Sequence, residues 1–135
     1  RRVGRVGDGW LVSSATPQEI SEGREIMFST AAEFDREIEY DHVGVLIGYY
    51  IAPDTKESED SAHRYITRDR PDAHFTEYSA LGRSEQIVQT IQEYIDAGAQ
   101  KFVVRPLCPA EETIEQLEIM GREILPRFLK KPVAH

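Results

Sequence analysis

The chain has 135 residues, enough for one domain with one hydrophobic core, and its 24 acidic against 16 basic side chains give a net charge of −8. This charge repels phosphate backbones and anionic lipids, and so argues against binding to nucleic acid or to a membrane surface. The single cysteine, Cys108, excludes an internal disulfide and favours a reducing, cytoplasmic location, and the sequence has neither an apolar run long enough to span a bilayer nor a signal-peptide pattern.

The first predicted elements are the last turn of a helix and a short strand. Val3 and Val6 lie three apart among arginines, which is the apolar spacing of a helix face, and Gly7 is typical of the residue that ends a helix. An Asp-Gly turn then leads into a strand over residues 10–13. A chain that starts within a helix is expected to be part of a longer protein.

A longer helix follows. Thr16 is the predicted N-cap, Pro17 suits the first helical position, and Glu19 can close a capping box. The helix is expected to run to about Asp35. Its buried face is predicted from four apolar residues at helical spacing: Ile20, Met27, Ala31 and Phe34.

The middle of the chain combines a buried strand with polar segments. Residues 42–52 are apolar on both alternating faces, which is typical of a strand in a parallel sheet covered on both sides. Residues 56–68 are predicted to form a polar, exposed helix. Residues 69–82 are predicted to form a loop, which is long enough to suggest a functional role.

The last third of the chain predicts a helix, a strand and a helix. The helix begins near residue 84 and is closed by Gly98, and a buried strand follows at 101–107. The final helix is expected from about Ala110 to Lys130. Its apolar stripe consists of five residues at helical spacing: Ile114, Leu117, Met120, Ile124 and Phe128.

The alternation of buried strands with amphipathic helices implies βαβ units and an α/β fold with a parallel sheet. The strands near 10–13, 42–51 and 101–106 are expected to lie parallel in chain order, with helices on the outer face. Three such strands fit either a small open sheet or part of a barrel. An eight-stranded (β/α)8 TIM barrel needs roughly 250 residues, so this chain can hold only about three of its units.

Three segments carry a resemblance to a known family. The stretch "RRVGRVGDGWLVSSATPQEISEGREIM" resembles the luciferase-like monooxygenase family, whose members commonly have an arginine- and alanine-rich helix, a G-D-G-aromatic strand and a T-P-E helix start. The stretch "LGRSEQIVQTIQEYIDAGAQKFVVRPL" is similar to the family's late helix ending in AG and its F-V-x-R-P strand. The stretch "IEQLEIMGREILPRF" is similar to its terminal helix. Where the family usually has Thr-Pro at a helix start, this chain has Arg83-Ser84.

The resemblance implies the C-terminal portion of a luciferase-like TIM barrel, with residues 1–135 forming one partial domain that covers strands six to eight. It also implies an oxidoreductase or monooxygenase whose cofactor, flavin mononucleotide (FMN) or an F420-type deazaflavin, is bound mostly by residues outside this chain. The chain would contribute barrel wall and part of the mouth for a small-molecule substrate. By itself it is expected to be inactive and to pair with the missing N-terminal half or with a second copy.

Candidate binding residues follow from the position of barrel active sites at the C-terminal ends of strands. Ser13 and Ser14 can donate hydrogen bonds to a substrate or cofactor phosphate, or they can simply lead into the Thr16 cap. Tyr49 is a further candidate. Since neighbouring strand residues point to opposite faces, at most one of Tyr49 and Tyr50 can line the barrel interior.

Arg105 stands at the end of an apolar strand, where a guanidinium is costly to bury unless an anion meets it. The partner is expected to be an anion of the substrate or cofactor, or a helix carboxylate such as Glu111 or Glu112. Gly82 and Arg83 open a helix, and helix N-termini attract anions, although a single glycine favours a plain helix cap over an anion site.

Other chemistries find little support in the sequence. His42, His63 and His74 have no partner at metal-ligand spacing, which argues against a metal site. The chain has no nucleophile elbow and no phosphate-binding P-loop, so an unrelated α/β hydrolase is disfavoured. The main alternative to an enzyme fragment is a stand-alone, non-catalytic module that binds a flavin or a partner chain.

Overall fold

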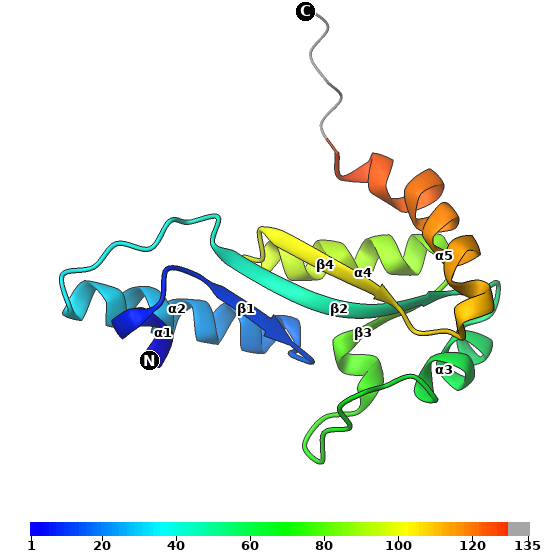
Figure 1. Ribbon diagram of the computed structural model, residues 1–135, viewed down its shortest axis with the longest axis horizontal. Coiled ribbons are helices and arrows are strands. Elements are labelled where there is room, and N and C mark those ends of the chain that lie inside the picture. The colour runs from blue at the N-terminus through cyan, green and yellow to red at the C-terminus, as the bar shows by residue number, and fades with distance from the viewer. Residues whose placement is uncertain (130–135) are drawn as a thin grey trace, which may run out of the picture.

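The computed structural model describes residues 1–129 and contains a four-stranded sheet in which every pairing is parallel. The central strand is β2 (Val43–Ile51). On one edge it pairs first with β1 (Trp10–Ser13) and then, further along, with β3 (Ser79–Gly82). On the other edge it pairs with β4 (Lys101–Pro106), as Figure 1 shows. The predicted parallel order of β1, β2 and β4 is therefore confirmed.

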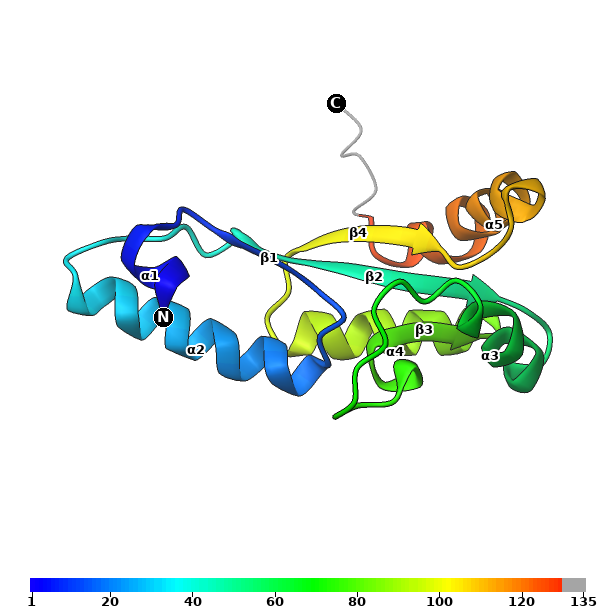
Figure 2. The ribbon, with the colours of Figure 1, turned by 60° about the horizontal axis from the view of Figure 1, so that its bottom comes forward.

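One face of the sheet is covered by two long helices, α2 (Pro17–Glu33) and α4 (Ser84–Asp96), which lie along it in Figure 2. Alternate residues of β2 point to this face because side chains of a strand alternate between its two sides. Together with apolar residues of both helices they form the main core. The largest fully buried side chains of this core are Ile20, Val43, Val45, Ile47, Tyr49, Ile87, Tyr94 and Ile124.

The start of α2 has the predicted chemistry. The Glu19 amide donates to the Thr16 hydroxyl, and the Glu19 carboxylate accepts from the Thr16 amide, so the capping box is complete. The preceding helix, α1 (Arg2–Val6), packs against α2. One part of the predicted buried face is wrong: Phe34 follows the last turn of α2, is exposed, and stacks under the Arg5 guanidinium.

The segment between β2 and α4 differs most from prediction. Helix α3 (Thr55–His63) ends five residues earlier than expected, and the predicted loop contains a 3-10 turn (Phe75–Tyr78) and the strand β3. β3 is short and lacks an alternating pattern, so its strand conformation comes from pairing with β2. The segment 55–78 thereby folds over the C-terminal end of the sheet (Figures 1 and 2).

The C-terminal helix begins as α5 (Thr113–Ile119) and continues through a π turn (Met120–Ile124) and a 3-10 turn (Leu125–Arg127). The irregular turns lead into Pro126, which has no N–H to donate and whose ring crowds the preceding turn. Met120 and Ile124 are buried as predicted, but Ile114 and Leu117 of the predicted stripe are exposed. The predicted helix end at Lys130 lies outside the described residues.

The second face of the sheet is largely open. Leu11 and Val103 point to this face, with exposed fractions of 63% and 47%. The prediction that both faces of the buried strands are covered is thus confirmed for the face under α2 and α4. It is wrong for the second face within the described residues. Among residues 1–129, no helix has the length and apolarity that crossing a bilayer requires.

Candidate binding site at the C-terminal end of the sheet

Two rows of side chains cross the open face near the C-terminal ends of the strands. The sheet register sets Ser13, Leu46 and Val103 side by side in the first row. In the next row Ser79 and Arg105 lie on either side of Gly48. Paired residues of neighbouring strands share a face, so all of these residues face the same side as the open surface. Because Gly48 has no side chain, it leaves space between Ser79 and Arg105.

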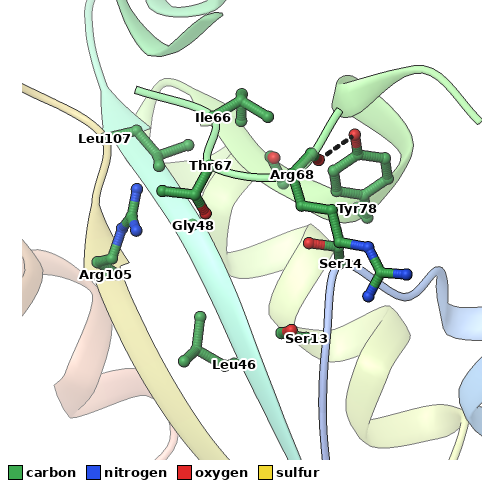
Figure 3. Close-up of a pocket in the computed structure, with 11 residues that line it drawn as sticks. Ser13, Ser14, Leu46, Gly48, Ile66, Thr67, Arg68, Tyr78, Arg105 and Leu107 are labelled. Atoms are coloured by element: carbon green, nitrogen blue, oxygen red, sulfur yellow. Dashed lines mark hydrogen bonds between the residues drawn. The ribbon is translucent and has the colours of Figure 1, made fainter. Parts of the chain in front are cut away.

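A cavity of about 180 Å³ occupies this space (Figure 3). β1 ends opposite Leu46 and β3 begins opposite Gly48, so the sheet edge is interrupted beside Ile47. The cavity lies at this interruption. Its lining comes from all four strands and from the segment that follows α3: Ser13, Ser14, Leu46, Gly48, Ile66, Thr67, Arg68, Tyr78, Ser79, Arg105 and Leu107.

Residues 65–68 are fastened over this cavity from two sides. Arg105 Nη2 donates to the carbonyl oxygen of Tyr65 at 2.6 Å. The Tyr78 hydroxyl donates to the carbonyl oxygen of Arg68 at 3.2 Å, which is the dashed line in Figure 3. Both contacts hold backbone carbonyls, so the side chains of Thr67 and Arg68 remain available to the cavity.

Arg70 clamps the same segment to the end of β1. Its Nη1 and Nη2 atoms donate to the two carboxylate oxygens of Glu19, each at 2.7 Å, and Nη1 also donates to the carbonyl oxygen of Ser14 at 2.9 Å. Asp72 accepts from the other side of the guanidinium. The hydrogen bonds from Arg70 lower the pKa of the Glu19 carboxyl to about 2, and they lower the pKa of Asp72 as well. Ser14 itself has a left-handed φ of 53°, a conformation that this clamp helps to hold.

The structure places the predicted site residues in three different settings. Ser13, Ser14 and Arg105 line one cavity, as their positions at strand ends suggested. The guanidinium of Arg105 meets a backbone carbonyl, and none of the ion pairs within residues 1–129 involves it. Glu112, one of the two carboxylates expected as its partner, instead accepts a hydrogen bond from the Tyr50 hydroxyl at 2.7 Å.

Tyr49 is a correction to the predicted site. Its side chain is 0% exposed and packs in the core on the helix-covered face, so it does not reach the open face. The odd-numbered residues of β2 point toward α2 and α4, and Tyr49 follows that parity. Burial raises the pKa of its hydroxyl to about 12, and the hydroxyl has no hydrogen-bond partner among the described residues.

Gly82 and Arg83 lie outside the cavity, at the start of α4. The Arg83 amide donates to the side chain of Gln86, and the Ser84 hydroxyl donates to the Glu123 carboxylate. Ser84 is the first helical residue, and Arg83 is the N-cap. The anion at this helix start is the chain's own Glu123, whose pKa is lowered by the contact with Ser84. Gly82 has a φ of 116° and serves the turn from β3 into α4.

One group of possible metal ligands lies at the opposite end of the sheet. Glu39, Asp41 and His42 bring ligand atoms within 4.8 Å of one another at the surface before β2. Asp41 also lies 3.5 Å from the Lys101 ammonium, and His42 Nδ1 bonds to the Asp8 carbonyl oxygen. Histidine spacing does not reveal this group, because its other two possible ligands are carboxylates.

Comparison with known proteins gives a match of structure without a match of sequence. No family model and no curated protein matches the chain. An F420-dependent secondary alcohol dehydrogenase in complex with an F420–acetone adduct superposes with a TM-score of 0.75 at 17% identity, over 96% of this chain and 45% of that one.

Two further solved structures agree. The coenzyme F420-dependent tetrahydromethanopterin reductase from Methanopyrus kandleri has a TM-score of 0.66 at 18% identity, over 94% of this chain and 47% of that one. The oxygenating constituent of 3,6-diketocamphane monooxygenase from Pseudomonas putida, in complex with FMN, has a TM-score of 0.67 at 14% identity. The match covers 95% of this chain and 45% of that one. The chain has the fold of part of a luciferase-like oxidoreductase. The resemblance in the sequence is thus confirmed at the level of the fold, and the chain spans about half the length of the structures that it matches.

Several cavity residues were not anticipated from the sequence, among them Gly48, Thr67, Arg68, Tyr78 and Ser79. Thr67 and Arg68 were assigned to an exposed helix, and Tyr78 and Ser79 to a loop. The one available signal was the length of the connection between β2 and α4, because long connections at the C-terminal end of a parallel sheet often carry function.

Proposed function

We propose that this chain is the C-terminal portion of a luciferase-like flavin- or deazaflavin-dependent monooxygenase or oxidoreductase. The observation that carries the proposal is the cavity beside the C-terminal ends of β1 and β4, because barrel enzymes of this architecture build their active sites at the C-terminal ends of their strands. Ser13, Ser14 and Arg105 line it from two strand ends. In this proposal the chain supplies barrel wall and part of the mouth for a small-molecule substrate.

The cofactor is proposed to be FMN or an F420-type deazaflavin, and most of its contacts are proposed to lie outside this chain. Sites that enclose a ligand of such size usually measure roughly 300–1,000 Å³. The cavity of about 180 Å³ is smaller and opens onto the uncovered face, so it fits one part of a ligand. The cofactor would supply the redox chemistry, while the residues of this chain bind and orient the substrate and exclude water.

The open sheet face is an argument for a partner that covers it. Leu11 and Val103 are exposed on it, and burying apolar surface contributes about 25 cal/mol per Å². The free edge of β4 also leaves backbone groups unpaired, and such edges recruit other strands. We propose that the N-terminal half of the barrel, or a second copy of this chain, covers this face, and that the chain alone is inactive.

The test uses the natural gene product at its full length. Its mass is measured, and reduced FMN and reduced F420 are titrated while absorbance and fluorescence follow binding and oxidation. The proposal expects a product long enough for a complete barrel that binds one of the two cofactors and oxidises it when a substrate is added. A natural product of 135 residues that is a stable monomer and binds flavin without turnover would establish the alternative, a stand-alone flavin-binding module.

A further inference from the structure

The cavity has a charge composition unlike that of the whole chain. The sequence has 24 acidic residues and a net charge of −8, yet within residues 1–129 no carboxylate lines the cavity. Its polar side chains are two arginines, Arg68 and Arg105, and five hydroxyl-bearing residues: Ser13, Ser14, Thr67, Tyr78 and Ser79. We propose that this cavity is a binding site for an oxyanion, the phosphate or carboxylate group of a substrate, with Arg105 and Arg68 as its cationic ligands.

Arg105 is positioned to bind such a group. The sheet register holds it beside Gly48, and its Nη2 contact to the Tyr65 carbonyl fixes the guanidinium plane. A guanidinium has five N–H donors, so most remain free for an oxyanion. Arg105 is half-buried, and a half-buried cation that meets only a neutral carbonyl gains strongly from an anion beside it.

Arg68 lines the cavity on the side opposite Arg105, on the segment that follows α3, and its side chain runs past Ser14 (Figure 3). Two carboxylates of this region, Glu19 and Asp72, are held by Arg70 through bonds of 2.6 to 3.0 Å. Arg70 therefore holds both carboxylates in direct ion pairs, and none of the ion pairs in the described part of the chain takes up Arg68. We expect Arg68 to be free to pair with a bound anion.

The interrupted sheet edge adds a neutral donor. Trp10 N–H donates to the carbonyl oxygen of His42, and Ala52 N–H donates to the carbonyl oxygen of Gly82, so the even-numbered residues of β2 direct their backbone groups to this edge. The Gly48 amide accordingly faces the interruption between β1 and β3. A backbone N–H, several hydroxyls and two guanidiniums are the donor set that proteins use for phosphate and carboxylate groups.

The first experiment tests anion binding by the 135-residue chain itself. Inorganic phosphate and, separately, malonate are titrated at constant ionic strength against chloride, while NMR follows the amides of Gly48 and Thr67 and the arginine Nε–H groups. We expect saturable shifts with at least one of the two anions. Arg105→Met and Arg68→Met should each weaken binding at least tenfold, which is about 1.4 kcal/mol, since each removes hydrogen bonds to a charged group.

The matched control is Arg64→Met, which removes an exposed arginine from the same segment but outside the cavity lining and should leave the affinity unchanged. Because Arg105→Met also removes the contact to Tyr65, Arg105→Lys is included and should retain part of the affinity. Shifts that do not saturate, or affinities that both Arg68→Met and Arg105→Met leave unchanged, would overturn the proposal.

A second experiment identifies the source of the anion. The assignment of the anion to a substrate rests on the proposed function, and this experiment tests the two separately. In the full-length natural protein, the affinities for FMN and for riboflavin are compared with and without Arg105→Met. A loss specific to FMN would assign the site to a cofactor phosphate and overturn its assignment to a substrate. If Arg105→Met leaves the affinities for FMN and for riboflavin unchanged but raises the KM for the substrate, the result supports the assignment to a substrate. Phosphate binding by a natural protein that turns over neither cofactor would overturn the proposed enzyme and leave the oxyanion site standing.

Discussion

At the scale of single residues, two arginines with different surroundings organise the site. Arg70 is saturated: Glu19, Asp72 and the Ser14 carbonyl occupy its donors, and its guanidinium lies over the Tyr78 ring. Arg105 makes one hydrogen bond to a backbone carbonyl. The first arrangement ties the mouth segment to the end of β1, and the second leaves donors for a ligand.

The Arg70 clamp makes a prediction about pH. The pKa of Glu19 is lowered to about 2 from its ordinary value of 4.5, so the folded state binds this proton less readily than the unfolded state. The stabilisation is therefore fully present above about pH 4.5 and is lost as the pH falls toward 2. In Arg70→Met the titration midpoint of Glu19 should rise toward the ordinary value. Carboxyl NMR titration measures it, and the same midpoint in both proteins would contradict the clamp.

Gly48 makes a prediction about packing. A Cβ built there would lie 2.7 Å from the Leu107 side chain, and it would occupy the floor of the cavity. Gly48→Ala should destabilise the fold by about 1–3 kcal/mol, because overpacking forces neighbouring side chains out of place. Gly121→Ala is the control, since among the described residues no atom other than those of its chain neighbours and its own helix backbone lies within 4 Å of the Cβ position. It should be neutral or stabilising by a few tenths of a kcal/mol up to about 1 kcal/mol. Urea denaturation compares the two.

At the scale of elements, buried polar side chains join the C-terminal end of β2 to its surroundings. Gln116 of α5 is 4% exposed, and its amide accepts from the Ile51 N–H at 2.8 Å and donates to the Ile51 carbonyl at 2.9 Å. Ser58 of α3 donates to the Tyr50 carbonyl and accepts from the Gly82 N–H. The Gln116 contacts satisfy backbone groups just beyond the end of the β2–β4 pairing, and the Ser58 contacts lie at the last residues that pair β2 with β3.

The Gln116 bridge can be tested by an isosteric change. Gln116→Leu keeps the size of the side chain but leaves both backbone groups of Ile51 without a partner, and we expect a loss of about 1–3 kcal/mol in the free energy of unfolding. Gln92→Leu is the matched control, because Gln92 bonds only to the exposed Asp96. Its effect should stay within about 0.5 kcal/mol. A small effect of Gln116→Leu would mean that water replaces the bridge.

At the scale of the whole molecule, the sheet has helices on one face and an open second face. Leu11 and Val103 are exposed there, and the solved structures with this fold have about twice the chain length. A fold that ends on an uncovered apolar face and a free strand edge tends to associate. Covering this face requires another polypeptide segment that packs against the whole sheet.

We therefore expect the 135-residue chain to have a molar mass in solution above 15.4 kDa, measured by light scattering. The double variant Leu11→Glu, Val103→Lys should shift the mass toward the monomer, because charged side chains oppose burial of that face. Val6→Lys is the control: Val6 is also exposed, but it lies on α1, away from the sheet face. A wild-type chain that remains monomeric at high concentration would contradict this prediction.

The amino-acid sequence by itself determined the local elements and the parallel sheet. Thr16, Pro17 and Glu19 set the start of α2, since capping depends only on residues within one turn. The strands β1, β2 and β4 followed from short apolar runs between helical patterns. The resemblance to luciferase-like enzymes rested on the order of these same segments, and the fold confirms it.

Only the tertiary structure decided which face each strand residue takes and which residues meet. Strand β3 exists because Ser79–Gly82 pairs with β2, and Tyr49 is buried because its parity turns it toward the helices. Arg105 meets the cavity because the register sets it beside Gly48, while Arg68 comes from a segment more than thirty residues away in the chain. Register and long-range contacts depend on packing between distant segments, and local sequence patterns carry little information about such packing.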